Sequence, residues 1–499
     1  MVSAVRDFSG RMILPLLALG GIAFGLKYYG FWGKRPARKV VMLMEKEKDN
    51  NSTDQVHDAK EDYFSQLPDD ILPSILAHLP IHDAVRTSVL SRRWKYLFAS
   101  MPRLNLRCLD MSGVYSANHS CCPCCQQKFL KGVNKILQLY SGRTVAHIEM
   151  VFCYGRKLPT ELDQLMCSIS RLGVERLRLT FHSYNKSIPF IFSLELLSQT
   201  SSLKHLFLNN CIVQPSIKVN FLRTLTLERV FLPKERFEAI LSSCLNLEQL
   251  TLKFCSLPGK ICVSGAIKSL VFFNCGVKEI DLQARNLCMF KCIGFGKVRF
   301  YFSFVPALAY VMIDLRQTES MPYIFGDFAR DLPAQIEILK AGIGPLEVKY
   351  FQRETEIFRN LRTLHLVLVD TNDFDIVKIS PILRFCPLLQ YLILDIKMTR
   401  CSADIPDSPL IISPTCHTEL KEAGFRGFHG TTAEIEFALY ILRSAMVLER
   451  LILSQRVRCY SGFGKWENTF VSFDETRQSS IQRQLHGQAI STKAVVAFV

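Results

Sequence analysis

Residues 244–255 read CLNLEQLTLKFC and place Leu247, Leu250 and Leu252 in the spacing L-x-x-L-x-L. Alternation of apolar with other residues over such a short stretch predicts a β-strand that buries one face. The same unit, with apolar residues or cysteine at its three positions, recurs as Leu203-Leu206-Leu208, Leu222-Leu225-Leu227, Ile267-Leu270-Phe272, Leu287-Phe290-Cys292, Leu361-Leu364-Leu366, Leu389-Leu392-Leu394 and Leu448-Leu451-Leu453. The chain is therefore built from repeats.

The spacing between units indicates how they stack. The middle positions 206, 225, 250, 270 and 290 are separated by 19, 25, 20 and 20 residues, close to the period of about 20–29 residues in leucine-rich repeats. A single unit cannot cover its own apolar side, so neighbouring units stack into a continuous core. We expect a curved α/β solenoid with a parallel β-sheet over residues 105–388.

The residues between the inward leucines are expected to line an exposed wall. This wall supplies the candidate target contacts His205, Phe207, Asn209, Thr224, Thr226, Glu228, Gln249, Thr251, Lys253, Val271 and Phe273. Phe207, Val271 and Phe273 are apolar where a solvated wall favours polar residues, which indicates an interaction patch. A slip of the strand register by one residue would instead bury them, and the sequence leaves both registers open.

Residues 63–104 form a different kind of segment, which the pattern predicts to be three short helices. Asp69 and Asp70 are candidate caps of the first helix, and Ser91 is the candidate cap of the third. An apolar stripe with spacings of three and four residues comprises Ile71, Leu72, Ile75, Leu76 and Leu79. A segment of this size has little core of its own, so the stripe needs a surface to cover it.

The stretches Leu67–Leu72, Leu79-Pro80 and Ala84–Trp94 closely resemble the F-box, although Pro73 departs from the usual pattern. The resemblance implies a module that binds the Skp-type adaptor, and through it the cullin, of a ubiquitin ligase. It also implies adaptor contacts at Leu67, Pro68, Ile71, Leu72, Ile75, Leu76, Leu79, Val85 and Trp94. The alternative from packing alone is that these residues rest on the repeat domain.

The C-terminal part, residues 389–499, resembles the FBD module of plant F-box proteins with leucine-rich repeats. The matching stretches are Leu420–Phe425, Phe428-His429-Gly430, Glu434–Phe437 and Leu448–Leu451. The fold expected from the whole resemblance is α/β: a short all-helical F-box module at 63–104, a curved leucine-rich-repeat solenoid and an FBD-like segment.

Residues 1–62 are expected to be an N-terminal apolar extension and a polar linker. Residues 12–26 read MILPLLALGGIAFGL, and the apolar character continues to Trp32. A membrane tether through residues 12–32 remains open, and the basic cluster after it would keep the rest of the chain in the cytosol. A start at Met42 or Met44, just before the polar stretch 45–62, is the alternative.

The 18 cysteines point to a reducing compartment, the cytoplasm or the nucleus, since most stand singly within apolar runs, as Cys211, Cys255 and Cys275 do. The exception is a cluster of two overlapping C-x-x-C pairs, made by Cys121, Cys122, Cys124 and Cys125. No second knuckle follows at zinc-site spacing, so we expect no metal. Zinc ligation and palmitoylation remain alternatives for these thiols.

The formal net charge of +16 is scattered along the chain rather than interleaved with aromatics, so no nucleic-acid partner is expected. Nucleotide-binding, metalloprotease and nucleophile-elbow motifs are missing, and we expect neither an enzyme nor a cofactor. The function expected is that of a substrate-recognition subunit of an SCF-type (Skp-cullin-F-box) ubiquitin ligase. The rival is a leucine-rich-repeat scaffold or membrane-tethered recognition protein outside any ligase.

Overall fold

The structure is a computed structural model. The residues that it describes are 67–108, 110, 123–140, 144–154, 159–183, 190–216, 219–294, 296–315, 323, 331–343, 358–369, 376–397, 416–462, 465–470 and 475–499. The N-terminal apolar run and the polar linker lie outside these residues, as do Cys121, Cys122 and the side chains of Cys124 and Cys125.

The described residues divide into two compact units, and β3 (Arg176–Ser183) contributes residues to both. The first unit contains α4 (Leu72–Leu76), α5 (Ile81–Thr87), α6 (Arg92–Phe98), β1 (Arg103–Arg107), α8 (Pro123–Leu139), β2 (His147–Tyr154) and α9 (Pro159–Ser170). The first three helices confirm the helical character expected for residues 63–104. β1 and β2 pair in parallel, with Leu104 opposite Ile148.

The caps of the short helices agree only in part with the sequence. The Ser91 side chain accepts a hydrogen bond from the Trp94 backbone N–H and caps α6, as predicted. Asp69 and Asp70 do not cap α4, whose N-cap is Ile71 without a side-chain hydrogen bond. Asp69 instead accepts from the Arg93 guanidinium at 2.8 Å, because the segment before α4 lies against α6.

The second unit contains β4 (Phe190–Ser193), η1 (Leu194–Leu197), β5 (His205–Asn209), β6 (Cys211–Gln214), β7 (Thr224–Glu228), α10 (Lys234–Ser243), β8 (Gln249–Lys253), β9 (Lys260–Ser264), β10 (Ser269–Phe273), β11 (Glu279–Gln283), β12 (Met289–Gly294), β13 (Arg299–Tyr301), β14 (Tyr310–Leu315), β15 (Ile338–Ile343), β16 (Thr363–Val369), η4 (Ile376–Ile379), α12 (Ser380–Arg384), β17 (Tyr391–Lys397), β18 (Glu422–Arg426), α13 (Thr432–Ser444), β19 (Arg450–Ser454), β20 (Arg456–Gly462), β21 (Lys465–Phe470), α14 (Glu475–Leu485) and β22 (Val495–Phe498).

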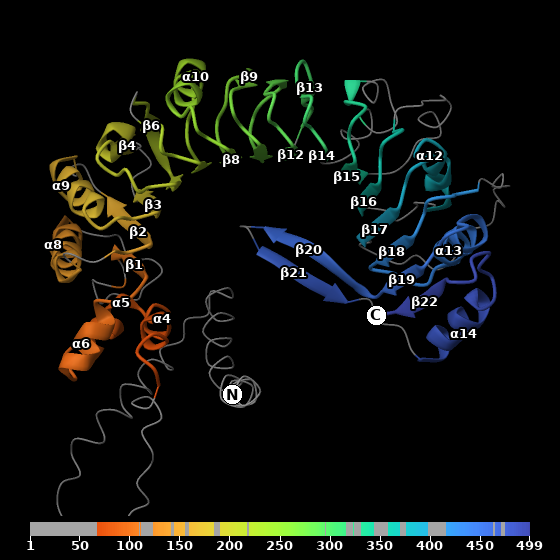
Figure 1. Cartoon of the computed structure of the whole chain (residues 1–499), viewed down its shortest axis with the longest axis horizontal. Coiled ribbons are helices and arrows are strands. Elements are labelled where there is room, and N and C mark those ends of the chain that lie inside the picture. Colours follow the sequence, from red (N-terminus) through yellow and green to blue (C-terminus); the bar gives the residue numbers. More distant parts are fainter. Residues whose placement is uncertain are drawn as a thin grey trace, which may run out of the picture. The chain divides into compact units, whose positions relative to one another are not determined.

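One long parallel sheet organises this unit. Its strands follow the order β5-β7-β8-β10-β12-β14-β15-β16-β17-β18-β19-β22. Helices α10, α12 and α13 lie on one side of this row of strands, and the antiparallel β20–β21 hairpin lies on the other (Figure 1). This long parallel sheet with helices confirms the α/β fold class.

Of the two registers that the sequence left open, the strands adopt the one that buries the leucines and exposes the wall residues. Leu206 lies opposite Leu225, and Leu225 lies opposite Leu250, so each leucine position forms a row across the sheet. The six leucines of β5, β7 and β8 are 0–2% exposed, while the residues between them are partly exposed. Each fully buried leucine contributes roughly 1.5–3 kcal/mol. This face is the core of the unit.

The length of each repeat decides what covers the leucine row. The 25-residue step from Leu225 to Leu250 accommodates α10. The two 20-residue steps that follow are too short for such a helix and return through β9 and β11. These strands form a second parallel sheet with β13, in the order β13-β11-β9. The aromatic rings of Phe272, Phe290 and Phe300 fill the space between the two sheets, with neighbouring centroids 6.3 and 5.4 Å apart.

The FBD-like stretches contribute a strand to the repeat sheet and the capped start of α13. Leu420–Phe425 leads into β18, which pairs in parallel with β17 and β19 and so continues the same sheet. Glu434 and Thr431 form a capping box at the start of α13, and the Glu434 carboxylate also accepts from the His429 backbone N–H. Gly430 has φ +69°, a conformation that glycine adopts readily.

Candidate functional site

The F-box-like helices leave several apolar side chains exposed. Val89 is 82% exposed, and Ile71, Leu79 and Leu90 are also exposed. Leu67, Ile75, Val85 and Trp94 are partly exposed and Pro68 is exposed. Apolar side chains of this number within about 20 residues favour a covering partner over bulk water.

Two residues of the expected adaptor stripe are buried rather than exposed. Leu72 and Leu76 are buried within the first unit, where α4 contacts α6, so their side chains stabilise the module and are not accessible to a partner. The stripe therefore splits into a buried row and an exposed row. Val89 and Leu90 join the exposed set although the sequence did not single them out as contacts, because they follow α5 in a turn.

The wall residues of the second unit lie where the sequence placed them. His205, Phe207, Asn209, Thr224, Thr226, Glu228, Thr251, Lys253, Val271 and Phe273 are partly exposed and Gln249 is exposed, all on the sheet face opposite the leucine row. The Arg178 guanidinium covers part of the Phe207 ring, since its central carbon lies 3.6 Å from the ring centroid. The wall thus combines rings, hydroxyls and cations.

The residue that follows each of four strands has a left-handed backbone. Asn210, Arg229, Phe254 and Asn274 have φ values of 59°, 52°, 52° and 50°. Each donates its backbone N–H to a carbonyl at or next to the end of the following strand of the sheet, as Arg229 does to the Lys253 carbonyl at 2.9 Å. This conformation costs an ordinary residue roughly 1–2 kcal/mol, and asparagine tolerates it best among non-glycine residues.

Arg229 and Phe254 are the functional candidates that sequence reasoning missed. The Arg229 guanidinium carbon lies 5.4 Å from the Phe254 ring centroid, and the Phe254 and Phe273 rings meet edge to face at 5.3 Å. A signal existed in the sequence: aligning the repeats places both residues in the column that Asn210 and Asn274 occupy, where asparagine would indicate a left-handed turn.

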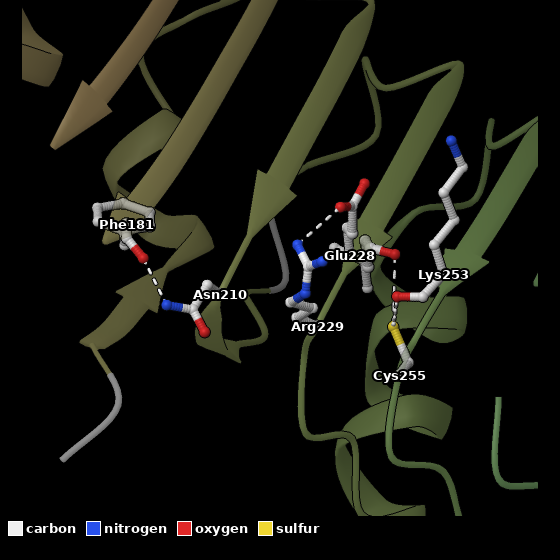
Figure 2. Close-up of polar contacts among 7 residues, drawn as sticks. Phe181, Asn210, Glu228, Arg229, Lys253 and Cys255 are labelled. Carbon is white, nitrogen blue, oxygen red and sulfur yellow. Dashed lines mark hydrogen bonds and ion pairs between the residues drawn. The ribbon is translucent and has the colours of Figure 1, made fainter. Parts of the chain in front are cut away.

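A buried thiol and an asparagine amide make hydrogen bonds to backbone carbonyls beside these left-handed residues. The Cys255 thiol donates to the carbonyls of Leu227 and Lys253, both at 3.4 Å, while Asn210 donates its side-chain amide to the Phe181 carbonyl at 2.6 Å (Figure 2). Burial raises the pKa of Cys211 to about 12, so this thiol stays protonated. A hydrogen bond with Cys275, together with burial, raises the pKa of Cys255. Cys211 and Cys255 are buried, as expected for cysteines within apolar runs, and Cys275 is partly exposed.

Farther along the same outward face, Asp395 meets a histidine and two cationic side chains from β15 to β18. His365 Nε2 lies 2.7 Å from Asp395 Oδ2, with Arg426 at 3.6 Å from Oδ1 and Lys340 at 4.0 Å from Oδ2. Burial alone would raise the pKa of Asp395. The His365 hydrogen bond and the nearby Lys340 and Arg426 cations outweigh burial, so the pKa of Asp395 lies below its usual value.

Comparisons with known proteins identify the modules of the chain. The leucine-rich-repeat domain model of the At1g61320/AtMIF1 type matches residues 136–485, and the F-box domain model matches residues 64–106. The F-box/LRR-repeat protein 25 of Arabidopsis thaliana is 32% identical over 200 residues, 39% of this chain and 68% of that protein. The chain belongs to the plant F-box/leucine-rich-repeat family.

Two relatives also carry the FBD name. The F-box/FBD/LRR-repeat protein At5g56810 and the FBD-associated F-box protein At5g56820, both of Arabidopsis thaliana, are 27% identical to this F-box/leucine-rich-repeat chain over 425 and 411 residues. Each alignment covers 79% of this chain, and the two cover 89% and 86% of the relatives. The repeat model ends at residue 485, in keeping with an FBD-like segment that continues the repeat sheet.

Two further properties of this F-box/leucine-rich-repeat protein concern only the described residues. Within them, no group of three or more His, Cys, Asp or Glu side chains is placed to hold a metal ion. None of the helices that the structure describes is long and apolar enough to cross a membrane. The tether predicted for residues 12–32 and the alternatives for the Cys121–Cys125 cluster fall outside this part of the chain.

Proposed function

We propose that the chain is the substrate-recognition subunit of an SCF-type ubiquitin ligase. Its F-box helices bind the Skp-type adaptor, and through it the cullin, while the outward face of the repeat sheet captures a target protein. The observation that carries the proposal is the exposed apolar set Ile71, Leu79, Val89 and Leu90 on a module that the F-box model matches. Burying these side chains against an adaptor removes apolar surface from water.

The chain's own contribution is positioning. A target bound to the repeats is brought to the same assembly as activated ubiquitin, which raises the effective concentration of its lysines at the reacting centre. The bond-forming chemistry then belongs to other subunits. The family to which the chain belongs supports this division of labour.

Co-purification with the adaptor tests the proposal. We expect the full-length wild-type chain, co-expressed with a Skp-type adaptor, to retain it, and Leu79→Asp combined with Val89→Asp to lose most of it. Both side chains are exposed, so the double variant keeps its fold.

A matched control is Leu245→Asp, an exposed apolar residue of the second unit that is 63% exposed and lies outside the F-box. It should retain the adaptor fully. Wild-type chain that fails to recover adaptor, or a double variant that recovers as much as wild type, contradicts the proposal and favours a scaffold outside any ligase.

A further inference from the structure

Two strained positions on the repeat sheet carry unusually large side chains. Arg229 and Phe254 hold the left-handed backbone position at the ends of β7 and β8, whereas Asn210 and Asn274 hold the same position in the flanking repeats. Asparagine tolerates this conformation, while arginine and phenylalanine do not favour it. Retained strain of this kind is a reason to look for a binding role.

The side chains at these positions gather with two wall residues into what we term the strand-end patch, made by Arg229, Lys253, Phe254 and Phe273. Lys253 and Phe273 are paired in register on β8 and β10. The Phe254 ring centroid lies 5.4 Å from the Arg229 guanidinium carbon and 5.3 Å from the Phe273 ring centroid. Both rings remain partly exposed.

The charge around these rings is mainly positive. Arg229 pairs with Glu228 at 3.1 Å, and about half of its side chain remains exposed. Lys253 makes no ion pair with any residue that the structure describes, and its ammonium group points away from the Glu228–Arg229 pair (Figure 2). On β12, Lys291 lies 5.1 Å from the Tyr310 ring centroid, which adds a further cation along the wall.

We propose that the strand-end patch binds an acidic segment of a target protein, with one aromatic or large aliphatic side chain placed beside its carboxylates. The apolar side chain packs on the Phe254 and Phe273 rings, and the carboxylates pair with Lys253 and Arg229. Charge complementarity of this kind favours acidic segments and disfavours basic ones. The proposal rests on the proposed function, since it gives the chemistry of the segment captured by the repeats.

Peptide selection on the full-length chain tests this directly. The probe is a phage-displayed library of random dodecapeptides, selected against the chain bound to its adaptor. We expect the enriched peptides to contain several Asp or Glu residues around an aromatic or large aliphatic residue. Binding of a selected, fluorescein-labelled peptide should weaken as salt rises from about 50 mM to about 500 mM, because the pairs are near the surface.

Variants then place the peptide on the patch. Arg229→Asn combined with Phe254→Asn introduces the residue that the flanking repeats use, so the backbone is retained while the side chains are lost. We expect peptide affinity to fall by at least tenfold. Lys253→Gln, which leaves both rings in place, should weaken binding several-fold. Phe231→Ala is the matched control, an exposed ring outside the patch, and should bind as wild type.

The selection would overturn the inference if no sequence were enriched or if neutral or basic peptides were enriched. The variants would overturn it if the double variant bound peptide within twofold of wild type. They would also overturn it if the double variant lost binding only because its melting temperature shows it to be unfolded, while Lys253→Gln bound peptide normally. Adaptor recovery measured on the same variants separates the two proposals. Loss of the adaptor by the wild-type chain counts against the proposed function, whereas failed peptide binding with the adaptor retained counts against the patch alone.

Discussion

The outward face of the repeat sheet has two parts that share strand register but differ in chemistry. From β5 to β10 it presents threonines, partly exposed rings and Lys253, which has no ion-pair partner in the described chain. From β15 to β18 it carries the charged group Lys340, His365, Asp395 and Arg426, in which Asp395 is buried and ion-paired. The β20 strand also contacts β17 in this second part.

The difference shows that position on the outward face does not by itself make a binding surface. In the second part, Lys340 and Arg426 lie within 4.0 Å of a carboxylate of the chain itself, that of Asp395. The first part leaves cations and rings that a partner's carboxylates and apolar groups can complement. We therefore propose that β5–β10 bind the target and that the group around Asp395 on β15–β18 stabilises the fold.

The largest effect should come from removing the central carboxylate. Asp395→Ala leaves His365 and Lys340 close together without their shared acceptor. Removing a partner from a fully buried ion pair costs about 3–5 kcal/mol. Because Lys340 and Arg426 keep contact with water, with side chains 21% and 51% exposed, we expect a smaller loss of about 1.5–3 kcal/mol in the free energy of unfolding, measured by urea titration.

Lys253→Ala is the matched control on the other part of the face. Its ammonium group has no ion-pair partner among the described residues, so the free energy of unfolding should change by less than about 0.5 kcal/mol. If the two variants lose equal stability, the division of the outward face into a structural and a binding part is wrong.

A smaller effect should appear in acid. The pKa of Asp395 is lower in the folded chain than the usual value, about 3.9 in an unfolded chain. Its contribution to stability is therefore complete above about pH 4 and is lost as pH falls through the folded pKa. Between about pH 6 and about pH 3, the unfolding free energy of wild type should fall more steeply than that of Asp395→Asn. Parallel curves would show that this carboxylate is not stabilised by its neighbours.

Much of the repeat architecture was predictable, because burying one face of a strand demands alternation that the sequence displays. The repeats that sequence analysis passed over use other apolar residues in the same spacing. They are Leu308-Val311-Ile313 in β14, Ile336-Leu339-Ala341 in β15 and Leu420-Ala423-Phe425 in β18, all nearly fully buried. Valine, isoleucine and alanine fill the core positions there that leucine fills in most of the recognised units.

Other features depend on contacts that no local pattern reveals. The group around Asp395 joins residues from four strands. Its outermost members, Lys340 and Arg426, are 86 positions apart in the sequence, so the group follows only from the sheet register. The left-handed backbone at Arg229 and Phe254 is visible in the sequence only through the asparagines that the flanking repeats carry at the same position. In the F-box, a spacing of three and four identified the apolar residues. It did not separate buried Leu72 and Leu76 from exposed Ile71 and Leu79, because α4 is only five residues long.

The central claim is that ligase docking and target capture use separate surfaces, the exposed F-box residues and the first part of the repeat wall. Calorimetric titration of the Skp-type adaptor into purified full-length chains tests it most directly. The account predicts that the Arg229→Asn, Phe254→Asn variant binds adaptor with wild-type affinity and one-to-one stoichiometry. It predicts that the Leu79→Asp, Val89→Asp variant, with an unchanged melting temperature, does not bind. Equal loss of adaptor affinity in both variants, or equal retention, would contradict it.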